Sequence, residues 1–146
     1  MANPTDAARE GGIRISSDPD DLDVDWIHRA LSERAYWALG RTRAAVDTSL
    51  RHSLCFGAFD GRRQVGLARV VTDHATFAWI CDVFVDEGYR GRGIGQQLIE
   101  TIVADERLRS LRRMLLATRD AGELYRHYGF EPLAAPERWL ERTSTS

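Results

Sequence analysis

Three glycines in alternation, Gly91, Gly93 and Gly95, stand where an apolar strand is expected to give way to a helix. The surrounding stretch reads "VFVDEGYRGRGIGQQL" and places Arg90 and Arg92 beside the glycines. Backbone N–H groups at a helix N-terminus, aided by the helix dipole, form a site suited to an anion such as a pyrophosphate. The two arginines add charge and bidentate donors. A tight turn with solvated arginines is the alternative interpretation.

The absence of lysine narrows the chemistry of this loop. All 20 basic side chains are arginine. A phosphate-binding P-loop lysine, a Schiff base and a lysine general base are therefore excluded. Because arginine does not deprotonate, it positions anions and does not transfer protons. The G-x-G-x-G spacing also differs from the G-x-G-x-x-G dinucleotide motif and from the Walker A motif.

The elements that must position this loop follow from the hydrophobic pattern. We expect an order of β-α-α-β-β-β-α-β-α-β, which is an α/β domain with a mixed sheet. A strand–helix–strand unit over 76–118 is expected to form a right-handed parallel crossover, with the glycine loop at the carboxyl end of its first strand. Asp60-Gly61 predicts a hairpin, Thr42 the start of a second helix, and "GFEPL" (129–133) a final strand.

Length and composition predict a single domain. The chain has 146 residues, 43% hydrophobic and 29% charged residues, and a net charge of −2. Residues 1–11 read as a disordered lead and 12–146 as the domain. The small net charge predicts neither nucleic-acid nor membrane partners, and no apolar run reaches the ~20 residues that span a bilayer. Two isolated cysteines indicate buried thiols, no metal site and a cytoplasmic location.

A second motif, "LYRHYGF", follows the next predicted strand, with Tyr125 four residues before Gly129-Phe130. With both motifs, the sequence resembles the Gcn5-related N-acetyltransferase (GNAT) superfamily. Its pyrophosphate loop, R/Q-x-x-G-x-G/A, falls on residues 90–95. The resemblance covers residues 12–140 in the order of the elements. It extends to specific sequence motifs only over 82–98 and 118–133. It implies the GNAT fold, acetyl-CoA as co-substrate, an amine acceptor, and a monomer or homodimer.

The resemblance also implies residues that bind the cofactor. Pantetheine would pair with the backbone of the strand at Val83, Phe84 and Val85, where one N–H would polarise the thioester carbonyl. Asp120 lies where many members carry an asparagine near the cofactor arm, and capping of the following helix is its alternative role. The N–H groups that would hold the pyrophosphate belong to Arg90, Gly91, Arg92, Gly93, Ile94 and Gly95.

For catalysis, the resemblance places Tyr125 beside the cofactor as the general acid that protonates the departing thiolate. Asp82 interrupts the apolar strand "FAWICDVFV", where an unpaired carboxylate would be costly. It is the candidate base or amine-holding group. A carboxylate satisfied by neighbouring N–H groups or arginines, with no part in the chemistry, is its alternative.

In this family the first two helices cover the acceptor. Tyr36 and Trp37, close to Arg41, would then offer aromatic faces to an amine or aromatic substrate, unless they are core anchors. We expect acetyl transfer to a small-molecule primary amine. Acetylation of a protein lysine or N-terminus, and a non-catalytic acyl-CoA-binding module, are the alternatives.

Overall fold

The computed structural model describes residues 12–144, and the expected disordered lead over 1–11 lies outside them. The chain forms one five-stranded sheet in which the strands follow their order along the chain. Strands β1 to β4 are antiparallel, and β5 pairs with β4 in parallel. The expected mixed sheet is therefore confirmed. Its strands are β1 (Ile13–Ser16), β2 (Leu54–Asp60), β3 (Arg63–Thr72), β4 (Phe77–Val85) and β5 (Arg113–Leu116).

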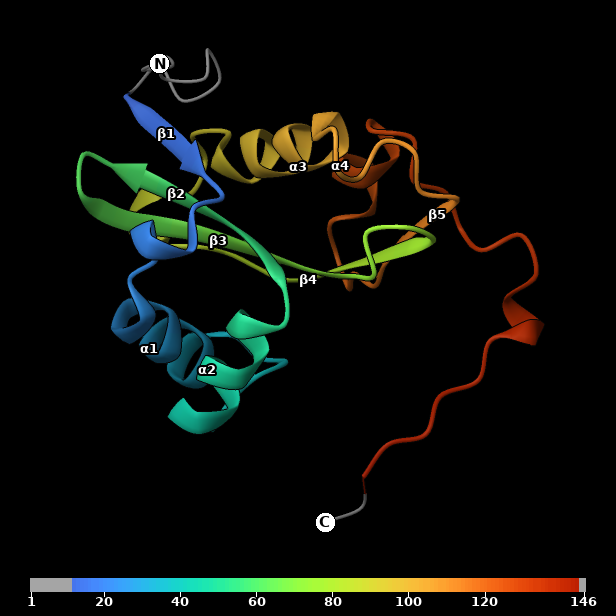
Figure 1. The fold of residues 1–146 in the computed structure, drawn as a ribbon, viewed down its shortest axis with the longest axis horizontal. Helices are drawn as coiled ribbons and strands as arrows, with labels where there is room; N and C mark the ends of the chain where they lie inside the picture. The colour runs from blue at the N-terminus through green and yellow to red at the C-terminus, as the bar shows by residue number, and fades with distance from the viewer. Residues whose placement is uncertain (1–11, 145–146) are drawn as a thin grey trace.

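Helices cover both faces of the sheet (Figure 1). One apolar core lies between the sheet and the pair α3 (Ile94–Ala104) and α4 (Gly122–Arg126). The second core lies between the opposite face and the pair α1 (Val24–Arg34) and α2 (Arg43–Arg51). Single turns of 3-10 helix complete the described chain: η1 (Pro19–Asp21), η2 (Glu87–Tyr89) and η3 (Pro136–Arg138).

Side-chain caps fix where the first two helices begin. The Asp23 carboxylate accepts a hydrogen bond from the Trp26 N–H at 3.0 Å, and the Thr42 hydroxyl accepts one from the Ala45 N–H at 3.1 Å. Each cap satisfies a backbone donor that the helix itself leaves unpaired. The expected helix start near Thr42 is confirmed. The caps also fix the ends of the α1–α2 loop, residues 35–42, which carries two candidate acceptor residues.

The parallel pair β4–β5 creates the opening in which the candidate site lies. Its register begins at Phe77–Arg113 and ends at Ile80–Leu116. Strand β4 nevertheless continues to Val85, paired only with β3 on its other side. The two strands therefore separate beyond Ile80, and α3 connects them as the predicted crossover.

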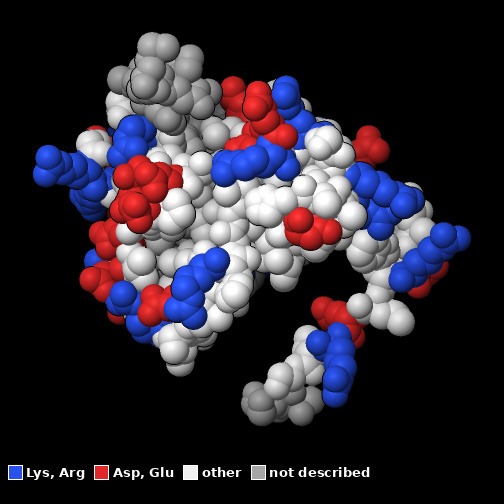
Figure 2. Space-filling view, in the orientation of Figure 1, with Lys and Arg blue, Asp and Glu red and all other residues white. Residues whose placement is uncertain are grey.

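The final strand expected over 129–133 does not form. The chain turns at Gly129, where φ is +91°, passes β5 without pairing over residues 130–133, and then leaves the body as a segment without strands (Figure 1). Pro132 lacks the N–H that a ladder bond to β5 requires, which accounts for the difference. Figure 2 shows this segment standing off from the body, and charges of both signs scattered over that face of the molecule.

No helix among residues 12–144 is long and apolar enough to cross a membrane.

Candidate active site

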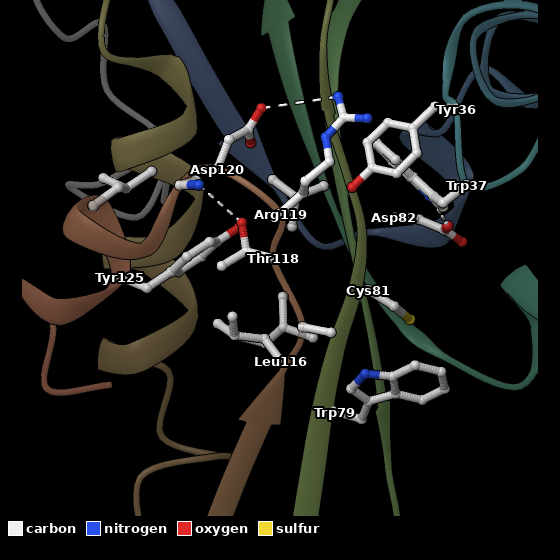
Figure 3. Close-up of a pocket in the computed structure, with 15 residues that line it drawn as sticks. Tyr36, Trp37, Trp79, Cys81, Asp82, Leu116, Thr118, Arg119, Asp120 and Tyr125 are labelled. Carbon is white, nitrogen blue, oxygen red and sulfur yellow. Dashed lines mark hydrogen bonds and ion pairs between the residues drawn. The ribbon is translucent and has the colours of Figure 1, made fainter. Parts of the chain in front are cut away.

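A cavity of about 600 Å³ occupies the opening between β4 and β5. Its walls come from four parts of the chain: β4, the end of β5 with the loop that follows, α4 and the α1–α2 loop (Figure 3). Tyr125 enters from α4, Asp82 from β4, and Tyr36 and Trp37 from the α1–α2 loop. Four predicted site residues that are up to 89 positions apart in the sequence therefore line one cavity.

The predicted pantetheine strand divides its side chains between the two faces of the sheet. Val83 lines the cavity, and both Val83 and Val85 pack against the α3 side. Phe84 is buried in the α1–α2 core, where its ring lies edge-on to Trp26 at a centroid distance of 6.2 Å. The edge of β4 that faces β5 has no strand partner beyond Ile80. An extended ligand can pair with such an edge through its own polar groups.

The glycine loop forms both a turn and a set of exposed backbone donors. Gly91 and Gly93 have φ of +81° and +77°, a left-handed conformation that other residues adopt only with strain. The first bond of α3 runs from the Gln97 N–H to the Gly93 carbonyl at 3.0 Å. The N–H groups of residues 93–96 therefore have no partner within the helix. This geometry suits an anion, as the spacing predicts.

The two arginines of this loop lie against neighbouring groups. The Arg90 Nε donates to the Val85 carbonyl at 3.1 Å, and the Arg92 guanidinium carbon lies 4.8 Å from the centre of the Tyr89 ring. Both arginines are exposed. Their charge thus lies beside the glycine loop while their terminal nitrogens remain accessible to an anion.

Asp82 is a buried carboxylate with three donors. Its Oδ1 accepts a hydrogen bond from the Trp37 indole at 2.7 Å, and its Oδ2 accepts bonds from Arg41 at 2.7 Å and Arg69 at 2.8 Å. Burial alone would raise the pKa of Asp82, but the hydrogen bonds from Arg69, Arg41 and Trp37 outweigh it, so the pKa lies below its ordinary value. The carboxylate is therefore a weak proton acceptor.

The backbone at Asp82 explains how it reaches these partners. Its φ is +52°, and the β3–β4 register shifts between Leu67 and Arg69, opposite this residue. Such a bulge re-aims one side chain out of the regular alternation of a strand. Aspartate tolerates the left-handed conformation better than most residues. The resulting cluster ties the α1–α2 loop to the middle of the sheet.

Tyr125 lies on the other side of the cavity, on α4 (Figure 3). Its side chain is 8% exposed, and its ring packs edge-on against Phe130 at a centroid distance of 5.9 Å. Burial raises the pKa of the Tyr125 phenol, so the hydroxyl keeps its proton at neutral pH. Within residues 12–144 its hydroxyl has no hydrogen-bond partner, so it remains able to donate to a ligand.

Asp120 does not cap the helix that follows it. The N-cap position of α4 is Ala121, whose N–H donates to the Thr118 hydroxyl at 3.0 Å. The Asp120 carboxylate instead lies 4.0 Å from Arg119 and is 77% exposed. The alternative role expected for it as a helix cap is thus wrong, and its carboxylate lines the cavity mouth.

Sequence reasoning missed several residues that line the cavity, among them Trp79, Cys81 and Arg119. Trp79 and Cys81 alternate along β4 with the buried Ile80 between them, so a strand period of two was the available signal for this pair. Arg119 adjoins Asp120, but nothing in the sequence indicates that its guanidinium reaches Tyr36. Burial raises the pKa of Cys81 to about 11 and that of Cys55 to about 12, so both thiols are protonated at neutral pH.

Comparison with known proteins agrees with this geometry. A family model described as an acetyltransferase (GNAT) domain matches residues 51–132, more than half of the chain. A Xanthomonas campestris pv. campestris crystal structure, assigned to the GNAT family of acetyltransferases, is 45% identical with a TM-score of 0.88. The similarity covers 90% of this chain and 93% of that one.

Curated sequence relatives are found in eukaryotes. FG08082 of Gibberella zeae, assigned as an acetyltransferase, is 33% identical over 79% of this chain and 76% of its own length. The histone acetyltransferase TAP1 of Glycine max is 37% identical over 78% of this chain, but only 49% of its own length is covered. The chain thus spans about half of TAP1.

A more distant structure of the same fold, from Clostridium acetobutylicum, was solved with acetyl-CoA. It is 17% identical over 90% of this chain and 95% of that one, with a TM-score of 0.65. In that protein, the same fold holds acetyl-CoA. With the family model, the Xanthomonas structure and the fungal relative in agreement, this chain is an acetyl-CoA-dependent N-acetyltransferase of the GNAT family.

Proposed function

We propose that the enzyme transfers the acetyl group of acetyl-CoA to a small-molecule primary amine by direct attack of the amine on the thioester. The observation that carries the proposal is the single cavity that joins the open edge of β4, the Tyr125 hydroxyl and the aromatic α1–α2 loop. Acetyl-CoA supplies the activated carbonyl. As the amine nitrogen bonds to the carbonyl carbon, the carbon–sulfur bond breaks, and the amine loses one proton.

Backbone groups would hold the cofactor. The open edge at Val83 and Val85 suits the amide groups of a pantetheine arm, and the N–H groups at the start of α3 suit a pyrophosphate. Arg90 and Arg92 would add charge beside the second of these. Asp120, exposed at the cavity mouth, would contact the cofactor arm.

Tyr125 would assist departure of the thiolate. A thiol with a pKa of about 8.5 and a phenol with a pKa of about 10 differ by roughly 2 kcal/mol, so complete proton transfer from the phenol is uphill. Burial raises the phenol pKa further. We therefore assign the larger part of the effect to a hydrogen bond that Tyr125 donates to the developing thiolate.

Asp82 is proposed to position the α1–α2 loop. A primary amine with a pKa of about 10.4 is neutral in about 1 part in 2,500 at pH 7, a cost of about 4.6 kcal/mol. A carboxylate with a lowered pKa and two arginine partners is poorly suited to take up that proton or to hold the ammonium ion. We assign the proton to water in the cavity, and to Asp82 the task of holding the Trp37 ring.

The α1–α2 loop favours a small acceptor over a protein. Trp37 is hydrogen-bonded to the buried Asp82, so the loop is fastened as one wall of the cavity and narrows the room for a peptide. A histone substrate, as in the name of TAP1, is the competing possibility for this chain.

The test is an acceptor panel assayed by release of free thiol from acetyl-CoA. The panel contains small amines and amino acids on one side, and lysine-containing and free N-terminal peptides on the other. We expect thiol release with small acceptors and none above background with peptides. Efficient acetylation of a peptide, with the small amines inactive, would overturn the proposal.

A further inference from the structure

The acceptor side of the cavity presents aromatic rings to solvent. Tyr36, Trp37 and Trp79 all line it, with exposed fractions of 51%, 41% and 45%. Tyr36 and Trp37 pack edge-on at a centroid distance of 5.0 Å, so each fixes the position of the other. Large exposed rings gathered at one cavity are typical of a binding site for an apolar or aromatic group.

Charge in the cavity does not suit an acceptor with two amines. Two acids line it, Asp82 and Asp120. The first is neutralised by Arg41 and Arg69, and the second lies beside Arg119. Three arginines therefore face two carboxylates. A second ammonium group would meet no uncompensated acid among the described lining residues and would lie near the guanidinium of Arg119.

Arg119 is held at the cavity mouth in an orientation that leaves its donors accessible. Its guanidinium carbon lies 3.9 Å from the centre of the Tyr36 ring, so the end of β5 meets the α1–α2 loop across the cavity (Figure 3). Its ion pair with Asp120 measures 4.0 Å, too long for a hydrogen bond. The side chain is 65% exposed. A planar guanidinium lying on a ring can donate two parallel bonds to a carboxylate.

We propose that the acceptor is an aromatic primary amine that carries a carboxylate, of the class of aromatic amino acids. Its ring would lie among Trp37 and Trp79, its carboxylate would pair with Arg119, and its amine would face the reaction centre near Tyr125. This inference rests on the proposed function and narrows the substrate class of that site. The structure favours this class over polyamines and over aromatic amines without a carboxylate.

The test compares three forms of one acceptor with the enzyme of residues 1–146: phenylalanine, phenylalaninamide and phenethylamine, with spermidine as a fourth arm. The readout is kcat/KM from thiol release at one pH, for the unaltered enzyme, Arg119→Gln and the control Arg62→Gln. Arg62 is exposed in the β2–β3 turn, outside the cavity. Because each acceptor is compared with itself in the variants, differences in amine pKa do not alter the effect assigned to Arg119.

We expect Arg119→Gln to lower kcat/KM for phenylalanine about tenfold, as loss of a charge-assisted pair predicts. The value for phenethylamine should change less than about twofold, and Arg62→Gln should match the unaltered enzyme throughout. The rise in melting temperature that acetyl-CoA causes should persist in both variants, which separates acceptor recognition from cofactor binding.

Three results would overturn the inference. They are a preference for spermidine or phenethylamine over phenylalanine, an equal loss for all acceptors in Arg119→Gln, or a weakened acetyl-CoA shift in that variant. None of these three results would contradict the proposed acetylation of small amines. If no small amine supports thiol release although acetyl-CoA raises the melting temperature, the inference and the proposed function both fail.

Discussion

At the residue scale, Asp82 is the most tightly held polar group in the cavity. Three donors occupy its two oxygens, and its side chain is 2% exposed. Breaking a buried ion pair by removing either partner destabilises a protein far more than breaking an exposed pair. We therefore propose that its role is structural first, with an effect on acceptor binding through the Trp37 hydrogen bond.

Asp82→Asn should lower the free energy of unfolding by about 3 kcal/mol, because Arg69 and Arg41 lose their charged partner. Asparagine tolerates the left-handed backbone at this position, so the substitution isolates the charge. Urea unfolding would measure the change. A kinetic effect confined to KM for the acceptor is expected. A stability loss below about 0.5 kcal/mol would contradict the assigned cluster.

The pH dependence of stability gives a second measure of the same carboxylate. Because the folded-state pKa of Asp82 lies below 3.8, its stabilisation is fully present above that pH and is lost as the pH falls further towards the folded pKa. The stability difference between the unaltered enzyme and Asp82→Asn should therefore be constant from pH 7 to 5 and shrink towards pH 3. A difference that grows between pH 7 and 5 would show a raised pKa instead.

At the element scale, the glycine loop combines two separable requirements. Gly93 needs a left-handed φ to begin α3, whereas Gly95 lies inside the helix, has no positive φ, and a methyl group there would meet nothing within 4 Å. The turn into α3 therefore depends on Gly93. The binding of a ligand that approaches the backbone closely would depend on Gly95 as well.

Gly95→Ala should stabilise the free protein by about 0.5–1 kcal/mol, since alanine is the better helix former, and yet weaken acetyl-CoA binding. Gly93→Ala should destabilise the free protein by about 1 kcal/mol through its strained φ. Melting temperatures with and without acetyl-CoA distinguish the two effects. Unchanged acetyl-CoA affinity in Gly95→Ala would mean that the ligand does not approach this residue closely.

Elements with strong local signals were predictable from the sequence, and long-range side-chain contacts were not. Asp60-Gly61, Thr42 and the glycine loop each determine a turn or helix start through their own backbone preferences. The partners of Asp82 depend on a bulge and a positive φ that no residue pattern indicates. The pairing of Arg119 with Tyr36 likewise joins residues 83 positions apart. The motif around Tyr125 predicted its place in the cavity because α4 follows β5 directly.

At the scale of the whole molecule, the two apolar cores contribute more to the stability of the fold than the C-terminal segment does. Residues 131–144 are exposed except for the half-buried Ala135, and Leu140 is 96% exposed. Beyond Leu133, the segment contacts the sheet where the Arg113 guanidinium carbon lies 5.0 Å from the Trp139 ring centre. The domain should thus fold without most of this segment.

A chain that ends at Leu133 should unfold cooperatively and lose no more than about 1 kcal/mol, the size of one exposed cation–π contact. Urea unfolding of the two chains checks this, and acetyl-CoA should raise both melting temperatures equally. A loss of several kcal/mol would show that the C-terminal segment contributes to the core in solution.

The central claim is that Tyr125 assists thiolate departure in a cavity where backbone groups bind the cofactor. The most direct test is kcat for Tyr125→Phe, measured by thiol release with saturating acetyl-CoA and the best small acceptor. The account predicts a fall in kcat of about 100-fold, as expected for loss of a general acid or its hydrogen bond, with the acetyl-CoA-induced rise in melting temperature retained. An unchanged kcat would contradict it.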